Sequence, residues 1–174
     1  MKKMKKNFII LFLIALIPIK AFALIEVDIT RGNLNPLPLA VSPLSIDDKS
    51  KKSFEKILKK ENIGSEISTI VENNLRTSGL FNPLNKDAFL QAPDIANLKP
   101  RFEDWNLIKA QALVTGKVTY VDEKLRVEFR LWDILAAKEM MALAFTTVPS
   151  NWRRVGHIIS DKVYERLTGE KGYF

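Results

Sequence analysis

Two runs of alternating residues joined by a two-residue link constrain the fold of this chain most strongly. The runs are "ALVTGKVTYV" (112–121) and "KLRVEFRLWDI" (124–134), and Asp122 and Glu123 lie between them. A period of two residues is typical of a strand with one buried face, and a two-residue link is typical of a β-hairpin. The run "KEMMALAFTTV" (138–148) predicts a third antiparallel strand. Residues 112–148 are therefore expected to form an antiparallel meander.

Three segments have the apolar spacing of helices. Residues 63–78 carry one apolar stripe, with Ser65 as the expected N-cap and Gly79 as the C-terminal cap. Residues 151–168 carry a second stripe, which begins at Trp152 and favours a place in the core for that side chain. This helix is expected to start at Ser150 or Asn151 and to end at Gly169. Residues 101–110 predict a short helix that supplies core contacts from Phe102, Trp105, Leu107 and Ile108.

The remaining segments are expected to be less regular. Prolines interrupt the apolar residues 37–44, so only Leu39–Val41 are free to pair within a sheet. Residues 80–85 predict a short extended piece, and residues 85–99 an irregular connector. Together, the predicted elements indicate a small α/β domain in which helices cover one or both faces of a sheet.

The first 23 residues have the order of a secretory signal peptide. Four lysines precede an uncharged apolar run from Phe8 to Ile19, and "AFA" (21–23) offers a cleavage site. The run is shorter than the roughly 20 residues that span a bilayer, so Leu24 is the expected first residue of the mature protein. Five of the lysines behind the formal net charge of +7 lie in this leader, which leaves about +2 for residues 24–174. Such a charge does not indicate a nucleic-acid partner.

The sequence offers no pattern for catalysis, a metal or a cofactor. It has no cysteine, and His157 is its only histidine. Asp161 lies four residues after His157, so a His–Asp pair on the helix surface is conceivable, but no nucleophile motif accompanies it. Phosphate-binding glycine motifs and metal-ligand motifs are also missing. We therefore expect a protein that is not an enzyme and that holds no cofactor or metal.

The segment "LIEVDIT" begins the predicted mature chain. Ile25, Val27 and Ile29 alternate with Glu26 and Asp28, as in a strand with one apolar face. A strand at the end of a chain leaves its own sheet at little cost, so it can add to the sheet edge of another protein. An ordinary edge strand within its own domain is the alternative. The expected partner-binding residues are Leu24, Ile25, Glu26, Val27, Asp28, Ile29 and Thr30.

Residues 47–62 are rich in lysine. Phe54, Ile57 and Leu58 have helical spacing among six lysines. One interpretation is a basic amphipathic helix that touches a membrane surface. The other, which we favour, is a solvated loop or short helix that places these three apolar side chains on the core.

Three stretches resemble the amino-terminal domain of the TolB family, the periplasmic component of the Tol–Pal system of Gram-negative bacteria. They are "NLRTSGLFNPL" (74–84), residues 112–134, and "NWRRVGHIISDKVYERLTGEKGYF" (151–174). The resemblance covers nearly all of residues 24–174. It implies a mixed sheet packed against two main helices, similar to the anticodon-binding domain of some tRNA synthetases.

The resemblance also implies a function and partners. In this family the mature N-terminal segment contacts the inner-membrane protein TolA, which corresponds to Leu24–Thr30 here. The family's main docking surface for the lipoprotein Pal is a six-bladed β-propeller that would begin near Phe174, so binding of Pal is not expected from these residues. The expected role is a periplasmic adaptor for outer-membrane integrity and for constriction at cell division.

Overall fold

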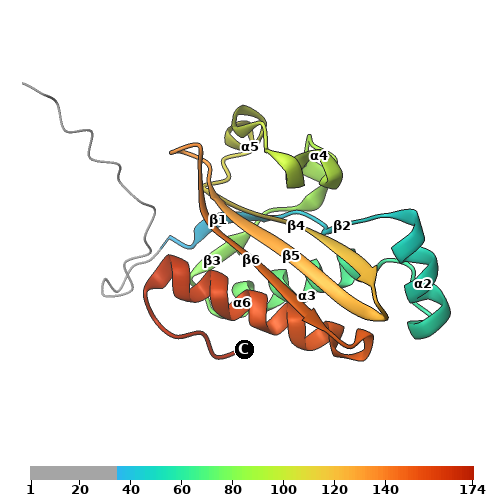
Figure 1. Ribbon diagram of the computed structural model, residues 1–174. Coiled ribbons are helices and arrows are strands. Elements are labelled where there is room, and N and C mark those ends of the chain that lie inside the picture. Colours follow the sequence, from blue (N-terminus) through green and yellow to red (C-terminus); the bar gives the residue numbers. More distant parts are fainter. Residues whose placement is uncertain (1–34) are drawn as a thin grey trace, which may run out of the picture.

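The computed structural model describes residues 35–174, except the side chain of Ala96. The expected leader and the segment Leu24–Thr30 lie outside the described residues. Figure 1 shows one sheet with α3 and α6 below it and α4 and α5 above it. The strands are β1 (Leu37–Val41), β2 (Ser45–Ile46), β3 (Phe81–Pro83), β4 (Ala112–Val121), β5 (Lys124–Asp133) and β6 (Lys138–Thr147). The α-helices are α2 (Asp48–Leu58), α3 (Ile63–Thr77), α4 (Pro93–Leu98), α5 (Phe102–Leu107) and α6 (Trp152–Thr168), and the 3-10 helices are η1 (Lys86–Ala88) and η2 (Pro149–Asn151).

The sheet is mixed, with strand order β3-β1-β4-β5-β6. The pairs β4–β5 and β5–β6 are antiparallel, which confirms the predicted meander. By contrast, β1 runs parallel to both β3 and β4, and β2 also pairs in parallel with β4. The β1–β4 register covers Leu39–Val41, the residues expected to pair freely. The prediction that only these residues pair is too narrow, because Leu37 and Pro38 pair with β3. Pro43 separates β1 from β2, because proline cannot donate a ladder hydrogen bond.

The main core lies between the sheet and the two long helices α3 and α6. Apolar residues of the meander, among them Leu125, Val127 and Phe129, are fully buried against Ile67, Leu75 and other residues of the two helices. This arrangement confirms the predicted mixed α/β domain with two main helices. Trp152 is 4% exposed and belongs to this core, as its place in the stripe predicts.

A second, smaller core covers the opposite face of the sheet. Trp105 of α5 packs there with Leu113 and Trp132, and Trp132 Nε1 donates a hydrogen bond to Thr115 Oγ1 at 2.9 Å. The prediction of an irregular connector over 85–99 is wrong, because η1 and α4 form within it. The predicted core contact of Leu107 is also wrong. Its side chain is 71% exposed, because it lies two residues, about 200° of helix rotation, from buried Trp105.

The ends of the helices differ in part from the expected caps. Helix α3 starts at Ile63, so Ser65 lies within its first turn and is not the N-cap. At its other end, Gly79 adopts a left-handed conformation with φ of 74°, as a C-terminal glycine predicts. Helix α6 follows Asn151 and ends at Gly169, both as predicted.

Candidate protein-binding edge

Among the described residues, strand β6 forms one edge of the sheet and pairs only with β5. The two-residue turn at Asp122 and Glu123 makes Val121 and Lys124 a hydrogen-bonded pair. Because hydrogen-bonded pairs alternate along an antiparallel ladder, the backbone groups of Leu125, Val127, Phe129 and Leu131 point toward β6. Their partners on β6 point back to β5. The N–H and C=O groups of the intervening residues Ala142, Ala144 and Thr146 therefore face outward from the sheet.

This edge lacks the usual protection against pairing. Monomeric proteins place charges or prolines on exposed edge strands, whereas the sequence from Met140 to Val148 contains neither. The start of the strand is covered, because Arg166 Nε of α6 donates a hydrogen bond to Met140 O at 3.4 Å. The side chains of Ala142, Ala144 and Thr146 are exposed. The open part of the edge is thus Met141–Thr147.

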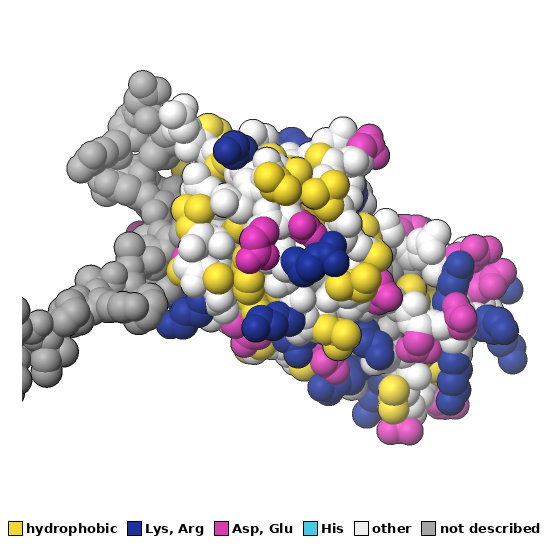
Figure 2. Space-filling model, turned by 90° about the horizontal axis from the view of Figure 1, so that it is seen from above, with side chains coloured by type: hydrophobic (Ala, Val, Ile, Leu, Met, Phe, Trp, Pro, Cys, Tyr) yellow, Lys and Arg dark blue, Asp and Glu magenta, His cyan; other side chains and the backbone are white. Residues whose placement is uncertain are grey.

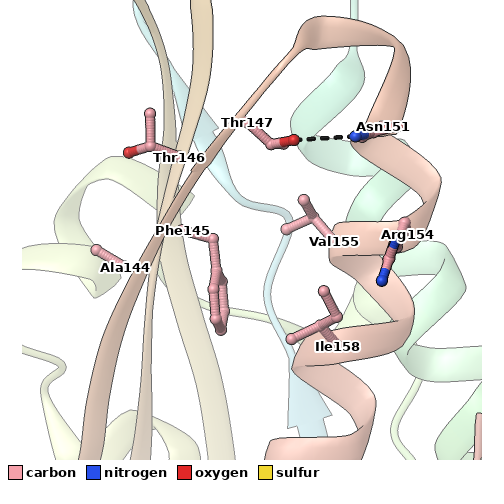
Figure 3. Close-up of a pocket in the computed structure, with 8 residues that line it drawn as sticks. All are labelled: Ala144, Phe145, Thr146, Thr147, Asn151, Arg154, Val155 and Ile158. Carbon is pink, nitrogen blue, oxygen red and sulfur yellow. Dashed lines mark hydrogen bonds between the residues drawn. The ribbon is translucent and has the colours of Figure 1, made fainter.

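A groove of about 370 Å³ lies between β6 and the first turns of α6. Figure 3 shows Phe145, Val155 and Ile158 in the space between strand and helix, whereas Ala144 and Thr146 lie on the other side of the strand. Phe145 is fixed by stacking on Phe129, with ring centroids 6.0 Å apart. The remaining residues that line the groove are Thr147, Asn151 and Arg154.

The groove is apolar at its floor and carries one cation. Arg154 is exposed and forms no ion pair within residues 35–174. Near the end of β6, Asn151 Nδ2 donates a hydrogen bond to Thr147 Oγ1 at 3.0 Å and ties the strand to η2. None of the lining residues is a carboxylate. The groove therefore suits an apolar ligand with a negative charge.

His157 does not form the side-chain pair with Asp161 that their four-residue spacing suggested. Its Nδ1 atom lies 2.9 Å from Asn74 Nδ2 of α3, and Asp161 Oδ1 accepts a hydrogen bond from the backbone N–H of Phe174 at 2.9 Å. The nearby Ser160 is fully buried, and its hydroxyl donates to Gly156 O at 2.9 Å. The contact with Asn74 connects α3 with α6 and gives His157 a packing role.

The carboxylates with shifted pKa values have structural partners. Burial by itself raises the pKa of Glu72, but hydrogen bonds and ion pairs with Arg76 and Lys86 outweigh it, so the pKa lies below its ordinary value. The backbone N–H of Ser50 lowers the pKa of Asp47, which caps the N-terminus of α2. Within residues 35–174, no group of three or more His, Asp or Glu side chains is placed to hold a metal ion.

The lysine-rich segment forms the helix α2. Phe54 is fully buried and Leu58 packs against the core, but Ile57 is 47% exposed, so the prediction of three core contacts is wrong for Ile57. Lys51 and Lys60 form ion pairs with Glu61 and Glu66. Figure 2 shows basic and acidic side chains interleaved at the α2 end of the molecule, on the right. No helix within the described part of the chain is long and apolar enough to cross a membrane.

The sequence did not point to the β6 edge. Residues 138–148 predict a strand, and the lack of charge from Met140 to Val148 is visible in the sequence. That it lies at the edge depends on the strand order, which the sequence did not reveal. The expected site residues Leu24–Thr30 lie outside residues 35–174, so their role stays a prediction.

Within residues 35–174, the mixed sheet, the two long helices and the outer edge of β6 define a small α/β domain with an open edge. The family model of the TolB amino-terminal domain matches residues 25–140, about two thirds of the chain. The chain therefore belongs to the TolB amino-terminal domain family.

Two comparisons with known proteins agree with this assignment. The chain is 87% identical over 165 residues to the Tol-Pal system protein TolB of Pelagibacter ubique, which covers 95% of this chain and 36% of that protein. The crystal structure of TolB from Acinetobacter baumannii superposes with a TM-score of 0.63 at 21% identity, covering 86% of this chain and 32% of that one. The second likeness supports the fold alone. The chain spans about a third of the length of both proteins.

Proposed function

We propose that this chain acts in the periplasm as a non-catalytic adaptor of the Tol–Pal system. The observation that carries the proposal is the 87% identity to a protein named as a Tol–Pal component. The buried hydroxyl of Ser160 and the packing role of His157 support a role without catalysis. As an adaptor, the protein would couple the inner membrane to the outer membrane and so support envelope integrity and constriction at division.

The proposed contact is between TolA and the segment Leu24–Thr30. Its alternation of apolar and acidic residues suits addition to a sheet edge of TolA. The family match begins at Ile25, the second residue of the expected mature chain, which supports a mature chain that starts with this segment. In this mechanism, the segment exchanges between its own domain and TolA, and the partner shifts that equilibrium.

Deletion of residues 24–30 tests the contact. The core described above is built from residues between Leu37 and Phe174, so we expect the deletion to leave thermal unfolding almost unchanged. Calorimetric titration with TolA should then show no binding. A variant that keeps the composition of residues 24–30 but scrambles their order is the control, and it should also bind poorly. Unchanged affinity in the deletion variant would reject the mechanism.

The exposed lysines of α2 support a second candidate, a module that binds anionic membrane surfaces. Lys49, Lys52, Lys56 and Lys59 form no ion pair in the described part of the chain, and Ile57 lies exposed among them. Four carboxylates in residues 47–62 reduce the charge of the segment to +2. Since each basic residue contributes about 1 kcal/mol near an anionic surface, the attraction is weak. Flotation with vesicles rich in anionic lipid, before and after these four lysines are changed to Gln, separates the two functions.

A further inference from the structure

Beyond the proposed role of Leu24–Thr30, we propose that the open edge of β6 and the groove beside α6 bind an extended segment of a partner protein. The segment would carry apolar residues at every second position and at least one carboxylate.

The backbone of β6 defines the shape of this ligand. The outward N–H and C=O groups of Ala142, Ala144 and Thr146 repeat with the spacing of a sheet ladder. An extended strand satisfies all of them at once, which is how peptides add to sheet edges. The exposed side chains at these three positions are small, so they leave the approach of another backbone unobstructed.

The groove defines the side chains of the ligand. Successive residues of an added strand face opposite sides of the sheet, so every second residue would lie over the groove beside α6. Phe145, Val155 and Ile158 present an apolar floor there (Figure 3). Arg154 brings a cation that has no ion-pair partner within residues 35–174. An apolar side chain therefore fits the floor, and a carboxylate near it would pair with Arg154.

A second copy of this chain is a poorer occupant. The natural symmetric contact would pair β6 with the β6 strand of the copy. The one carboxylate of that strand, Glu139, already pairs with Arg130 Nε at 3.3 Å, and the residues from Met140 to Val148 carry no charge, so the copy offers Arg154 no free carboxylate. Charge complementarity therefore favours a different protein.

The chain's own segment Leu24–Thr30 has suitable chemistry, but its attachment to β1 lies far from the groove. The register places Leu39 level with Lys138, at the start of β6. The groove residues Ala144–Thr147 lie about 20–30 Å further along the strand, and β1 is three strand spacings, about 14 Å, to the side. Residues 31–36 span at most about 25 Å. Residues 31–36 attach at Leu37, two residues further back, so they hold Thr30 near the start of β6. The segment could therefore cover the groove only by running antiparallel to β6 with residues 31–36 fully stretched.

Peptide selection on the purified protein tests the proposal. The probe is a displayed library of random ten-residue peptides, and selected sequences are then synthesised for affinity measurements. We expect enriched peptides to alternate apolar residues with polar ones and to contain Asp or Glu.

Ala144→Pro removes an outward N–H without removing a bond to β5, so it should weaken binding about tenfold or more. The matched control Ala144→Val keeps that N–H and should bind within about twofold of the native protein. Arg154→Glu should shift selection toward Lys and Arg.

Four results would overturn the proposal. The first is a failure to enrich peptides, or enrichment without alternation. The second is equal binding by the native protein and by Ala144→Pro. The third is a dimer, seen by sedimentation of the protein alone, that Ala144→Pro abolishes, because a second copy would then occupy the edge. The fourth is slow amide exchange at Ala142, Ala144 and Thr146 that becomes fast when residues 24–30 are deleted, because that segment would then be the occupant.

Discussion

Gly156 of α6 packs directly against Ile70 of α3, and replacing this glycine gives a sharp test of the packing. A Cβ atom at position 156 would lie 2.9 Å from Ile70 Cγ2 and 3.0 Å from Ile70 Cβ. Contacts this short force the neighbouring side chain or the helix to move. Gly156→Ala gains about 1 kcal/mol of helix propensity, but overpacking of a filled core costs about 1–3 kcal/mol. We therefore expect a net loss of about 1 kcal/mol in the free energy of unfolding.

A double-mutant cycle with Ile70→Ala isolates the cause. This change removes Cγ2 and Cδ1 of Ile70, which are two of the three nearest atoms, and leaves only Cβ near the new methyl group. Gly156→Ala should then be close to neutral, so the coupling free energy between the two positions is about 1 kcal/mol. Urea unfolding of the native protein, both single variants and the double variant measures it. Additive effects, or a stabilising Gly156→Ala in the native background, would refute the packing argument.

Three further predictions concern the turn, the cap of α2 and the leader. Glu123 has φ of 58° in the hairpin turn, a region that favours glycine, so Glu123→Gly should stabilise the protein by about 0.5–1 kcal/mol in urea unfolding; a lower midpoint would contradict the assigned turn. The pKa of Asp47 is lowered by hydrogen bonds from Ser50, so its stabilisation is present above the ordinary value of 3.8 and is lost as the pH falls through the folded-state pKa. Asp47→Asn should therefore lose less stability than the native protein between pH 5 and about pH 2, and equal losses would contradict this. Mass spectrometry of the protein from its native cells should show Leu24 as the first residue, whereas retained Met1 would contradict export with cleavage.

The long elements could be predicted because their patterns are strict. The alternation from Leu125 to Leu131 and the stripes of α3 and α6 leave little choice of period, and their buried faces are those expected. Helix α4 was missed because its six residues begin with Pro93 and are too short to show a period. In α2, Phe54 and Leu58 face the core, and Ile57, one residue before Leu58, is turned partly to solvent.

The strand order could not be predicted for a different reason. The pairing of Leu39 with Ala112 joins residues far apart in the sequence, and local propensity carries no information about such contacts. The edge position of β6, and with it the groove at Arg154, follows from that order. The role of Leu24–Thr30 was inferred from alternation and from family resemblance, and it rests on no contact of the described residues.

The affinity of TolA for a synthetic peptide of residues 24–33, "LIEVDITRGN", tests the central claim most directly. If the mature N-terminal segment is the binding element, the peptide should bind TolA within a few-fold of the affinity of the whole protein, and a peptide of scrambled order should not bind. TolA that binds the whole protein but not the peptide would place the contact elsewhere on the domain and contradict the account.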